Sequence, residues 1–263
     1  MRRWFGIQHY RRGDRLAAAE THIALTGTPN ATFSTIRYTL SMNYQLCLYK
    51  DEAAPQAPLR LPTGAAIRAV YVIHGGLRVR ADAFEGVLGG NSAFYAAGDA
   101  QLSAGHLVTW VLRWELARAG APDSLASGEG VTSKKLLTAP MQLETAKEYL
   151  LRCDRVDFPP DGEALTHTHK GGGIRCLLAG GIDIHTNNTV HRYAPLEPWY
   201  EAGPDPVYAK AAPTMASGFA RVMILPRELL GKSSITYVKP EDIDKPKNQK
   251  YQVFIDTPIS LPA

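Results

Sequence analysis

The chain repeats part of its own sequence at a fixed separation of 105 residues. The segments that match without a gap are Gly75–Val79 (GGLRV) with Gly180–Ile184 (GGIDI), and Phe94–Gly98 (FYAAG) with Trp199–Gly203 (WYEAG). Trp110–Glu115 also resembles Ala220–Leu225 after a small insertion. Repetition at a fixed period indicates a duplicated structural unit. We therefore expect two similar units in tandem, each of about 75 to 110 residues, the size of a small β-barrel.

The apolar segments predict strands. Ile67–Ile73 is rich in β-branched and aromatic residues, which favour strands, and the turn pair Gly75-Gly76 follows it. Leu107–Leu116 is the strongest strand candidate of the first half, and Arg221–Leu225 predicts a buried strand in the second. The 18 prolines and 23 glycines indicate many turns between short elements. The expected fold class is all-β.

Composition divides the chain into four parts. Residues 1–41 have no clean apolar period and read as a poorly specified N-terminal extension. Because Met42 resembles an ordinary protein start, one hypothesis is that the natural chain begins there. Residues 42–118 and 144–263 are predicted to form the two barrels. Residues 119–143, which begin with a stretch rich in Ala, Gly and Ser, are expected to be an exposed linker.

Two histidines in the second half lie two residues apart, in Thr166-His167-Thr168-His169. On a strand they would point to the same side, because side chains alternate between the two faces. Neutral imidazole is a common ligand for zinc, iron, copper and nickel. A His-x-His strand that faces a barrel interior therefore predicts half of a metal site. The following run Gly171–Gly173 would allow close backbone approach to a ligand, or would form a flexible turn.

With these features the chain resembles the cupin superfamily, as a tandem-domain bicupin of the RmlC-like jelly-roll type. His167, His169 and Gly180 match the first cupin motif, whereas its leading glycine is displaced to Gly162 and its glutamate is replaced by Gly173. In the second motif Gly203 matches, but Pro206 stands where a metal-binding histidine is expected. The resemblance covers most of residues 60–260 and implies two double-stranded β-helix barrels. Residues 199–207 also resemble an uncharacterised bacterial subgroup of cupins.

The resemblance implies a mononuclear metal with three or four protein ligands, so His167 and His169 need a further donor. Glu201 is the best candidate, because it would share a strand face with Trp199. Two imidazoles and a carboxylate form the facial set of non-haem iron proteins. The expected cofactor is a divalent transition metal: Fe, Mn, Zn or Ni. Alternatively, Glu201 is an exposed strand-end carboxylate, and the histidine pair is a hydrogen-bonded relic.

The other histidines are weaker candidates. His185 and His191 flank a predicted hairpin turn, and His74 and His106 lie at turns of the first unit, where we expect surface residues. At the offset of the repeat, Pro62 and Gly64 stand against the two motif histidines, so the first barrel is expected to be metal-free.

Two functions follow. The first is a bicupin that binds a divalent metal and a small organic ligand in its C-terminal barrel, with a metal-dependent dioxygenase or related enzyme as the implied activity. The alternative is a non-catalytic small-molecule binding or sensing bicupin with a degenerate metal site. The retained His-x-His favours the first, and the missing glutamate and histidine favour the second. No Gly-x-Ser-x-Gly elbow or phosphate-binding loop indicates another chemistry.

The charge, the apolar runs and the cysteines of the chain indicate which partners and which cellular location to expect. The formal charge is only +4, and no run of basic residues interleaved with aromatic ones is present. We therefore do not expect the protein to bind nucleic acid. No apolar run approaches the roughly 18 residues of a membrane span. Three cysteines without a Cys-x-x-Cys pair, and no secretory signal after Arg2 and Arg3, favour a cytoplasmic location. Open sheet edges and the apolar strand 110–116 predict a homodimer.

Overall fold

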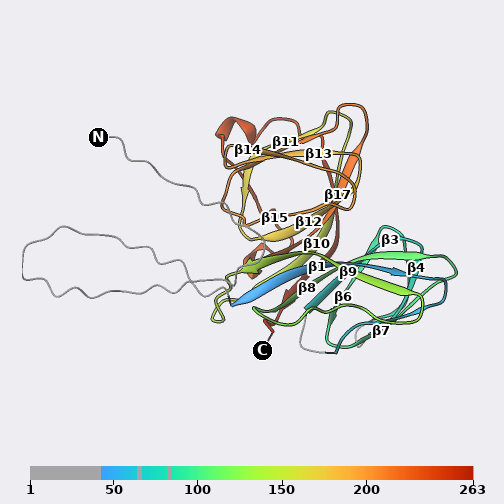
Figure 1. Cartoon of the computed structure of the whole chain (residues 1–263). Coiled ribbons are helices and arrows are strands. Elements are labelled where there is room, and N and C mark those ends of the chain that lie inside the picture. The colour runs from blue at the N-terminus through green and yellow to red at the C-terminus, as the bar shows by residue number, and fades with distance from the viewer. Residues whose placement is uncertain (1–42, 64–66, 82–83, 263) are drawn as a thin grey trace, which may run out of the picture. The chain divides into compact units, whose positions relative to one another are not determined.

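The structure is a computed structural model that describes residues 43–63, 67–81 and 84–262. The N-terminal extension expected over residues 1–41 lies outside the described residues, as do Met42 and Gly64. The described residues form β-strands with two short 3₁₀ turns, Arg227–Leu229 and Pro240–Asp242 (Figure 1). The expected all-β class is therefore confirmed. In this part of the chain no helix has the length and apolar character needed to cross a membrane.

The first half folds into two antiparallel sheets. The larger sheet contains, in order across it, β6 (Ser92–Ala97), β3 (Ile67–His74), β8 (Thr109–Arg118), β1 (Tyr44–Ala53) and β9 (Val131–Met141). The smaller sheet contains β2 (Pro58–Arg60), β7 (Ala100–Ala104), β4 (Gly76–Ala81) and β5 (Phe84–Gly89). An apolar cluster that includes Val70, Leu77, Val79 and Val111 fills the space between them. The two sheets thus make one jelly-roll barrel.

The second half repeats this arrangement. Its sheet that is equivalent to the larger sheet of the first half contains, in order, β15 (Pro198–Glu201), β12 (Gly173–Ala179), β17 (Ser217–Pro226), β10 (Tyr149–Phe158) and β19 (Lys250–Ile259). Its second sheet contains β14 (Thr189–Tyr193), β13 (Ile182–Thr186), β16 (Val207–Ala211), β11 (Glu163–His169) and β18 (Ile235–Tyr237). Apart from β18, each strand of this barrel has a counterpart at the same place in a sheet of the first barrel.

The segments that repeat in the sequence fall on equivalent strands. The GGLRV and GGIDI segments lead into β4 and β13, FYAAG and WYEAG lead along β6 and β15, and the third pair lies on β8 and β17. Gly75 and Gly180 both have positive φ, 83° and 77°, in which a side chain is strained. At each of them a Cβ atom would lie 2.4 Å from a backbone carbonyl oxygen, that of Val108 or Ala216. The repeat therefore reflects the same turn built twice.

The larger sheet of the first barrel and its equivalent in the second pack against each other through a shared apolar core. Leu46, Tyr71 and Trp114 of the first barrel and Ile174 and Val222 of the second belong to one buried cluster. The indole Nε1 of Trp114 donates a hydrogen bond to the carbonyl oxygen of Ile174 at 3.1 Å. Consequently the central strands β8, β12 and β17 are buried on both faces, which explains their nearly continuous apolar sequence.

Two expectations about the first half need correction. The segment 119–143 is not only a linker, because it contains β9, which pairs with β1 along its length. The homodimer is predicted partly from the apolar strand 110–116. This segment lies in β8 between β3 and β1, and its apolar face packs on the other barrel. It offers no free pairing surface, and the homodimer stays a prediction without that ground.

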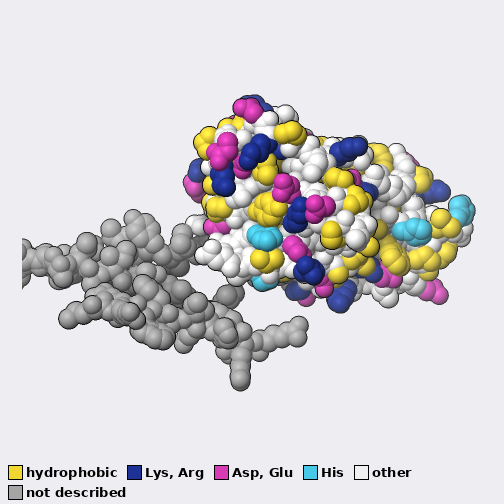
Figure 2. Space-filling model, turned by 90° about the horizontal axis from the view of Figure 1, so that it is seen from above, with side chains coloured by type: hydrophobic (Ala, Val, Ile, Leu, Met, Phe, Trp, Pro, Cys, Tyr) yellow, Lys and Arg dark blue, Asp and Glu magenta, His cyan; other side chains and the backbone are white. Residues whose placement is uncertain are grey.

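Acidic and basic side chains are interspersed with apolar ones on the face that Figure 2 shows. This mixture agrees with the small formal charge of +4. A single-sign surface of the kind that steers polyanions is not what this face presents.

Candidate functional site

The histidine pair lies inside the second barrel. His167 and His169 on β11 are only 6% and 4% exposed, and both line a cavity between the two sheets. The pairing of β11 with β16 shifts register between Ala164 and His167. Such a bulge frees backbone groups and re-aims side chains, and bulges are frequent beside functional sites. Here it leaves the carbonyl oxygen of Leu165 free to accept a hydrogen bond from the ring of His167.

That hydrogen bond fixes the protonation of His167. Its Nδ1 lies 2.7 Å from the Leu165 carbonyl oxygen, which can only accept, so Nδ1 carries the hydrogen. The neutral ring therefore presents an unprotonated Nε2 to the cavity. That atom lies 3.2 Å from Nε2 of His169, whose Nδ1 is in turn 3.5 Å from the hydroxyl of Ser234. Partners on the outer nitrogens are the usual way in which metal-binding histidines are oriented.

Glu201 turns inward on β15, on the same face as Trp199. The Trp199 indole donates to Oε1 of Glu201 at 2.8 Å. The other oxygen, Oε2, lies 3.4 Å from Nε2 of His169 and 2.7 Å from a guanidinium nitrogen of Arg175. The Glu201 side chain is 14% exposed, so it is not an exposed strand-end carboxylate. The structure thus brings Glu201 to His169, but it also pairs Glu201 with an arginine.

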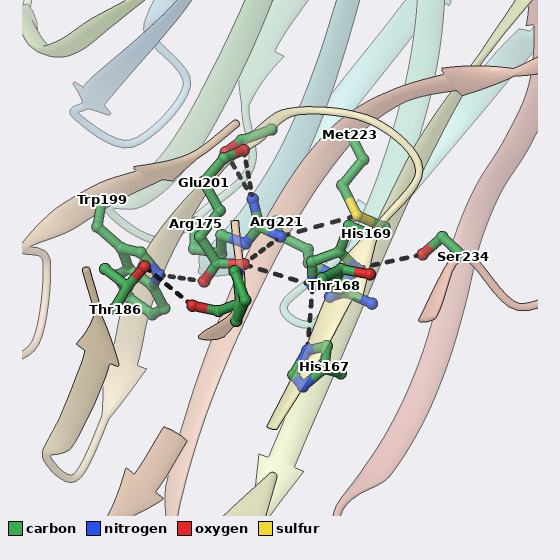
Figure 3. A network of polar contacts seen from close by, with 12 residues as sticks. His167, Thr168, His169, Arg175, Thr186, Trp199, Glu201, Arg221, Met223 and Ser234 are labelled. Carbon is green, nitrogen blue, oxygen red and sulfur yellow. Dashed lines mark hydrogen bonds and ion pairs between the residues drawn. The ribbon is translucent and has the colours of Figure 1, made fainter. Parts of the chain in front are cut away.

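Arg175 belongs to a charged layer on the sheet that faces the histidines (Figure 3). In the strand register Arg175 of β12 lies opposite Arg221 of β17, and Arg221 lies opposite Asp154 of β10. Arg221 binds the Asp154 carboxylate through Nε and Nη2, at 2.6 and 3.0 Å. The layer therefore holds two guanidinium groups and two carboxylates, each in an ion pair.

Sequence reasoning missed these arginines and Asp154. The available signal was a single charged residue inside an otherwise apolar strand, as in Ile174-Arg175-Cys176. A buried charge of this kind requires a partner of opposite sign. The sequence does not say which carboxylate that partner is.

The pKa values follow from burial and from this layer. Burial lowers the pKa of both histidines, that of His169 to about 3, so the imidazoles are neutral at pH 7. Burial alone would raise the pKa of the Glu201 carboxyl, but the charge of Arg175 and hydrogen bonds from His169 and Trp199 hold it below its usual range. Burial also lowers the pKa of Arg175 to about 10, against the favourable charge of Glu201. Both members of the Arg175–Glu201 pair therefore stay charged.

The cavity itself is small. Its volume is about 20 Å³, which accommodates one water-sized group. Around the polar groups its walls are apolar and aromatic: Val156, Phe158, Ile184, Val207, Phe219 and Tyr251. A ligand larger than a few atoms requires these walls to move.

The residues fit a divalent metal in type and orientation. Two Nε2 atoms, with a carboxylate beside one of them, supply the donors of a three-ligand site. The opposing feature is the commitment of Glu201 to Arg175. Accordingly, within the described residues, no group of three His, Cys, Asp or Glu side chains converges as it would around an ion.

The cupin motifs place further ligands at the positions of Gly173 and Pro206. Here the first position has no room for a side chain, and the second lies at the surface. At Gly173 a Cβ atom would lie 2.3 Å from the Val222 carbonyl oxygen and 2.8 Å from Met223 Cγ, so no glutamate fits there. The run Gly171–Gly173 thus approaches the backbone of β17. Pro206 is exposed, and its carbonyl oxygen accepts a hydrogen bond from Thr186.

The other four histidines within the described residues lie away from this cavity. His185 and His191 flank a tight hairpin turn in which Asn187 and Asn188 have positive φ. His185 packs edge-on against the ring of Tyr208. His74 and His106 are exposed, as the sequence predicted.

The first barrel encloses a different polar cluster. Arg113 binds Asp51 through Nε and Nη2, at 2.7 and 3.2 Å, and binds Glu115 through Nη1 at 2.5 Å. Arg68 binds the same oxygen of Glu115 at 2.6 Å. These four side chains are at most 2% exposed, and Arg113 also stacks over the ring of Tyr49.

Comparison with known proteins identifies the fold. No family model and no curated protein matches the sequence. Among solved structures, the oxalate decarboxylase of Lactobacillus farciminis in a formate complex is similar over 78% of this chain and 82% of its own, with 10% identity and a TM-score of 0.59. A mutant of the Bacillus subtilis oxalate decarboxylase OxdC is similar over 76% of this chain and 72% of its own, with 10% identity and a TM-score of 0.57.

A third similar structure is AerE from Microcystis aeruginosa, which matches 73% of this chain and 95% of its own, with 12% identity and a TM-score of 0.50. Similarity at this level of identity shows the fold. Together with the two barrels it confirms the expected fold of two tandem jelly-roll barrels, and membership of the cupin superfamily stays a prediction. The uncharacterised bacterial subgroup stays a prediction.

Proposed function

We propose that this chain binds a divalent transition metal (Fe, Mn, Zn or Ni) and a small organic ligand in its second barrel, through His167, His169 and Glu201. The observation that carries the proposal is the histidine pair itself. Its two Nε2 atoms lie 3.2 Å apart at a buried cavity, and hydrogen bonds to Leu165 and Ser234 orient the rings from behind. Two neutral, fixed imidazoles that point at each other suit a shared cation.

The structural neighbours support this function over the non-catalytic sensing module. One of them is the Bacillus subtilis oxalate decarboxylase, which contains Mn(II) centres. We also propose that the chain divides into its two units between β9 and β10, so that the metal site belongs wholly to the second. In this proposal the first barrel holds no metal and packs against the barrel that does.

The residues around the site have definable tasks. When bound, a divalent ion would supply a Lewis acid that polarises an oxygen atom of the ligand. His167 and His169 would hold it, with their orientation fixed by Leu165 and Ser234. Phe158 and Phe219 keep bulk water from the cavity, which strengthens the electrostatic interactions inside it.

Metal analysis tests the proposal. The protein would be stripped with a chelator, incubated with Mn²⁺ or Fe²⁺ together with formate as a small organic ligand, desalted into formate buffer and analysed by mass spectrometry for metal per chain. We expect close to one equivalent in the wild type, and at least tenfold less in His167→Ala and His169→Ala. The control variants His185→Ala and His191→Ala remove histidines outside the cavity and should keep the metal. Substoichiometric metal in the wild type, or equal loss in the controls, would refute the site.

A further inference from the structure

Arg175 is bound on both sides inside the second barrel. It is 0% exposed, one nitrogen donates to the Gly173 carbonyl oxygen at 2.6 Å, and another lies 2.7 Å from Oε2 of Glu201. That same oxygen is the one nearest His169, at 3.4 Å. The guanidinium therefore occupies the side of Glu201 on which a metal shared with the histidines would lie (Figure 3).

The charges around the cavity are already balanced. Arg175 and Arg221 are matched by Glu201 and Asp154, and all four side chains belong to the buried site. The neutral imidazoles add no charge. A divalent cation would bring two further positive charges next to two guanidinium groups, in a region where water screens poorly. Metal binding therefore needs a new negative charge, because Arg175 has no path to solvent.

Resting on the function proposed above, we propose that Arg175 holds the place of the cation on Glu201, so that metal binding requires a small anion to enter the cavity with the metal. The anion offsets part of the added positive charge, because it lies against both the guanidinium released from Glu201 and the cation. Its chemistry is that of a compact carboxylate or similar anion, because the cavity of about 20 Å³ admits an anion beside the metal only when its walls move, and a small anion requires the least movement. By thermodynamic linkage the metal must strengthen anion binding by the same factor.

A titration of the unaltered protein tests this coupling directly. Mn²⁺ would be added to the metal-free wild type with and without formate, and free Mn²⁺ would be followed by electron paramagnetic resonance. We expect at least tenfold tighter Mn²⁺ binding with formate. The same titration of His167→Ala corrects for Mn²⁺ that formate binds in solution. Equal affinity with and without formate would overturn the coupling, even though metal binding itself would stand.

Two matched variants test the role of Arg175. Arg175→Gln removes the charge that engages Glu201 and should bind Mn²⁺ at least tenfold more tightly than the wild type in the absence of formate. Arg221→Gln removes an equally buried guanidinium that engages Asp154, and it should gain much less. An equal gain in both variants would overturn direct competition at Glu201.

The outcomes separate this inference from the metal site itself. If neither the wild type with formate nor Arg175→Gln binds Mn²⁺, the proposed metal site is wrong, and the inference falls with it. If the wild type binds Mn²⁺ independently of formate, only the inference is wrong. Circular dichroism verifies that each variant is folded, and if Arg175→Gln is not, the wild-type titration with formate decides.

Discussion

In the first barrel Arg113 forms ion pairs with two carboxylates, Asp51 and Glu115, and Arg68 forms an ion pair with the same oxygen of Glu115. In the second barrel Arg221 has one carboxylate, Asp154, and Arg175 has another, Glu201. Both barrels thus bury arginines paired with acids on the sheet that faces the other barrel. A buried charge layer of this kind can be structural by itself, since the first barrel keeps one without histidines in contact.

The difference between the barrels lies on the facing strand. At the place in the sheet that β11 occupies, the first barrel has the three-residue β2, whose buried side chain is Leu59. In the second barrel β11 has seven residues and directs His167 and His169 at the charges. An apolar side chain thus stands in the first barrel where the second has two imidazoles that line a small cavity. The histidine pair therefore lies on a longer version of a strand that both barrels share.

The largest expected effect concerns the charge layers. Arg113→Met would break two buried ion pairs, leaving Asp51 without a guanidinium partner and Glu115 with Arg68 alone, and breaking a buried ion pair costs about 3–5 kcal/mol. Arg221→Met would break only the pair with Asp154, so it should lose less. Urea denaturation followed by circular dichroism measures both free energies of unfolding. Equal losses would mean that the two layers are energetically alike despite their different connectivity.

A smaller effect is expected at the glycine that replaces the motif glutamate. Gly173→Ala places a methyl group 2.3 Å from a backbone oxygen, and overpacking of this kind costs about 1–3 kcal/mol. Its control in the first barrel is Gly89→Ala, where a Cβ meets nothing within 4 Å and the change should stay within about 0.5 kcal/mol. Thermal unfolding compares them. A neutral Gly173→Ala would show that β12 and β17 can separate enough for a ligand there.

The smallest expected effect concerns the buried cysteines, which should not react with a thiol reagent in the native protein. Cys153 and Cys176 lie in the core between the barrels, and burial raises the pKa of both thiols, that of Cys176 to about 12. A raised pKa keeps a thiol protonated at pH 8, and the thiolate is the reactive form. Native protein should leave both cysteines unmodified by a thiol reagent over hours, while denatured protein reacts fully. Rapid modification of the native protein would indicate that the barrels separate.

Much of the fold could be predicted because the sequence repeats and because its central strands are strongly apolar. The edge strand β9 was missed for a physical reason. Its side chains are mostly half-buried or exposed, it carries Lys134 and Lys135, and it contains Pro140. Edge strands often have such residues, and they weaken the alternation on which strand prediction depends.

The site was predictable in part. The spacing of His167 and His169 indicated a common inward face, and the spacing of Trp199 and Glu201 did the same. The ion pair of Glu201 could not be predicted from the sequence, because its partner Arg175 is 26 positions away in the chain. The two residues are brought together only by the pairing of β12 with β15. Neighbours across a sheet are set by register, which no local pattern records.

The shared core bears on how such a molecule can evolve. Alternate residues of β12 serve two purposes: Ile174 and Cys176 pack on the first barrel, while Arg175 faces the cavity. After a duplication, a barrel that loses its ligands would ordinarily be free to decay. Here it cannot, because the other copy would then expose an apolar sheet face and lose the support behind its own binding strand. Selection on solubility and rigidity would be enough to preserve the first barrel, whether or not it binds a ligand.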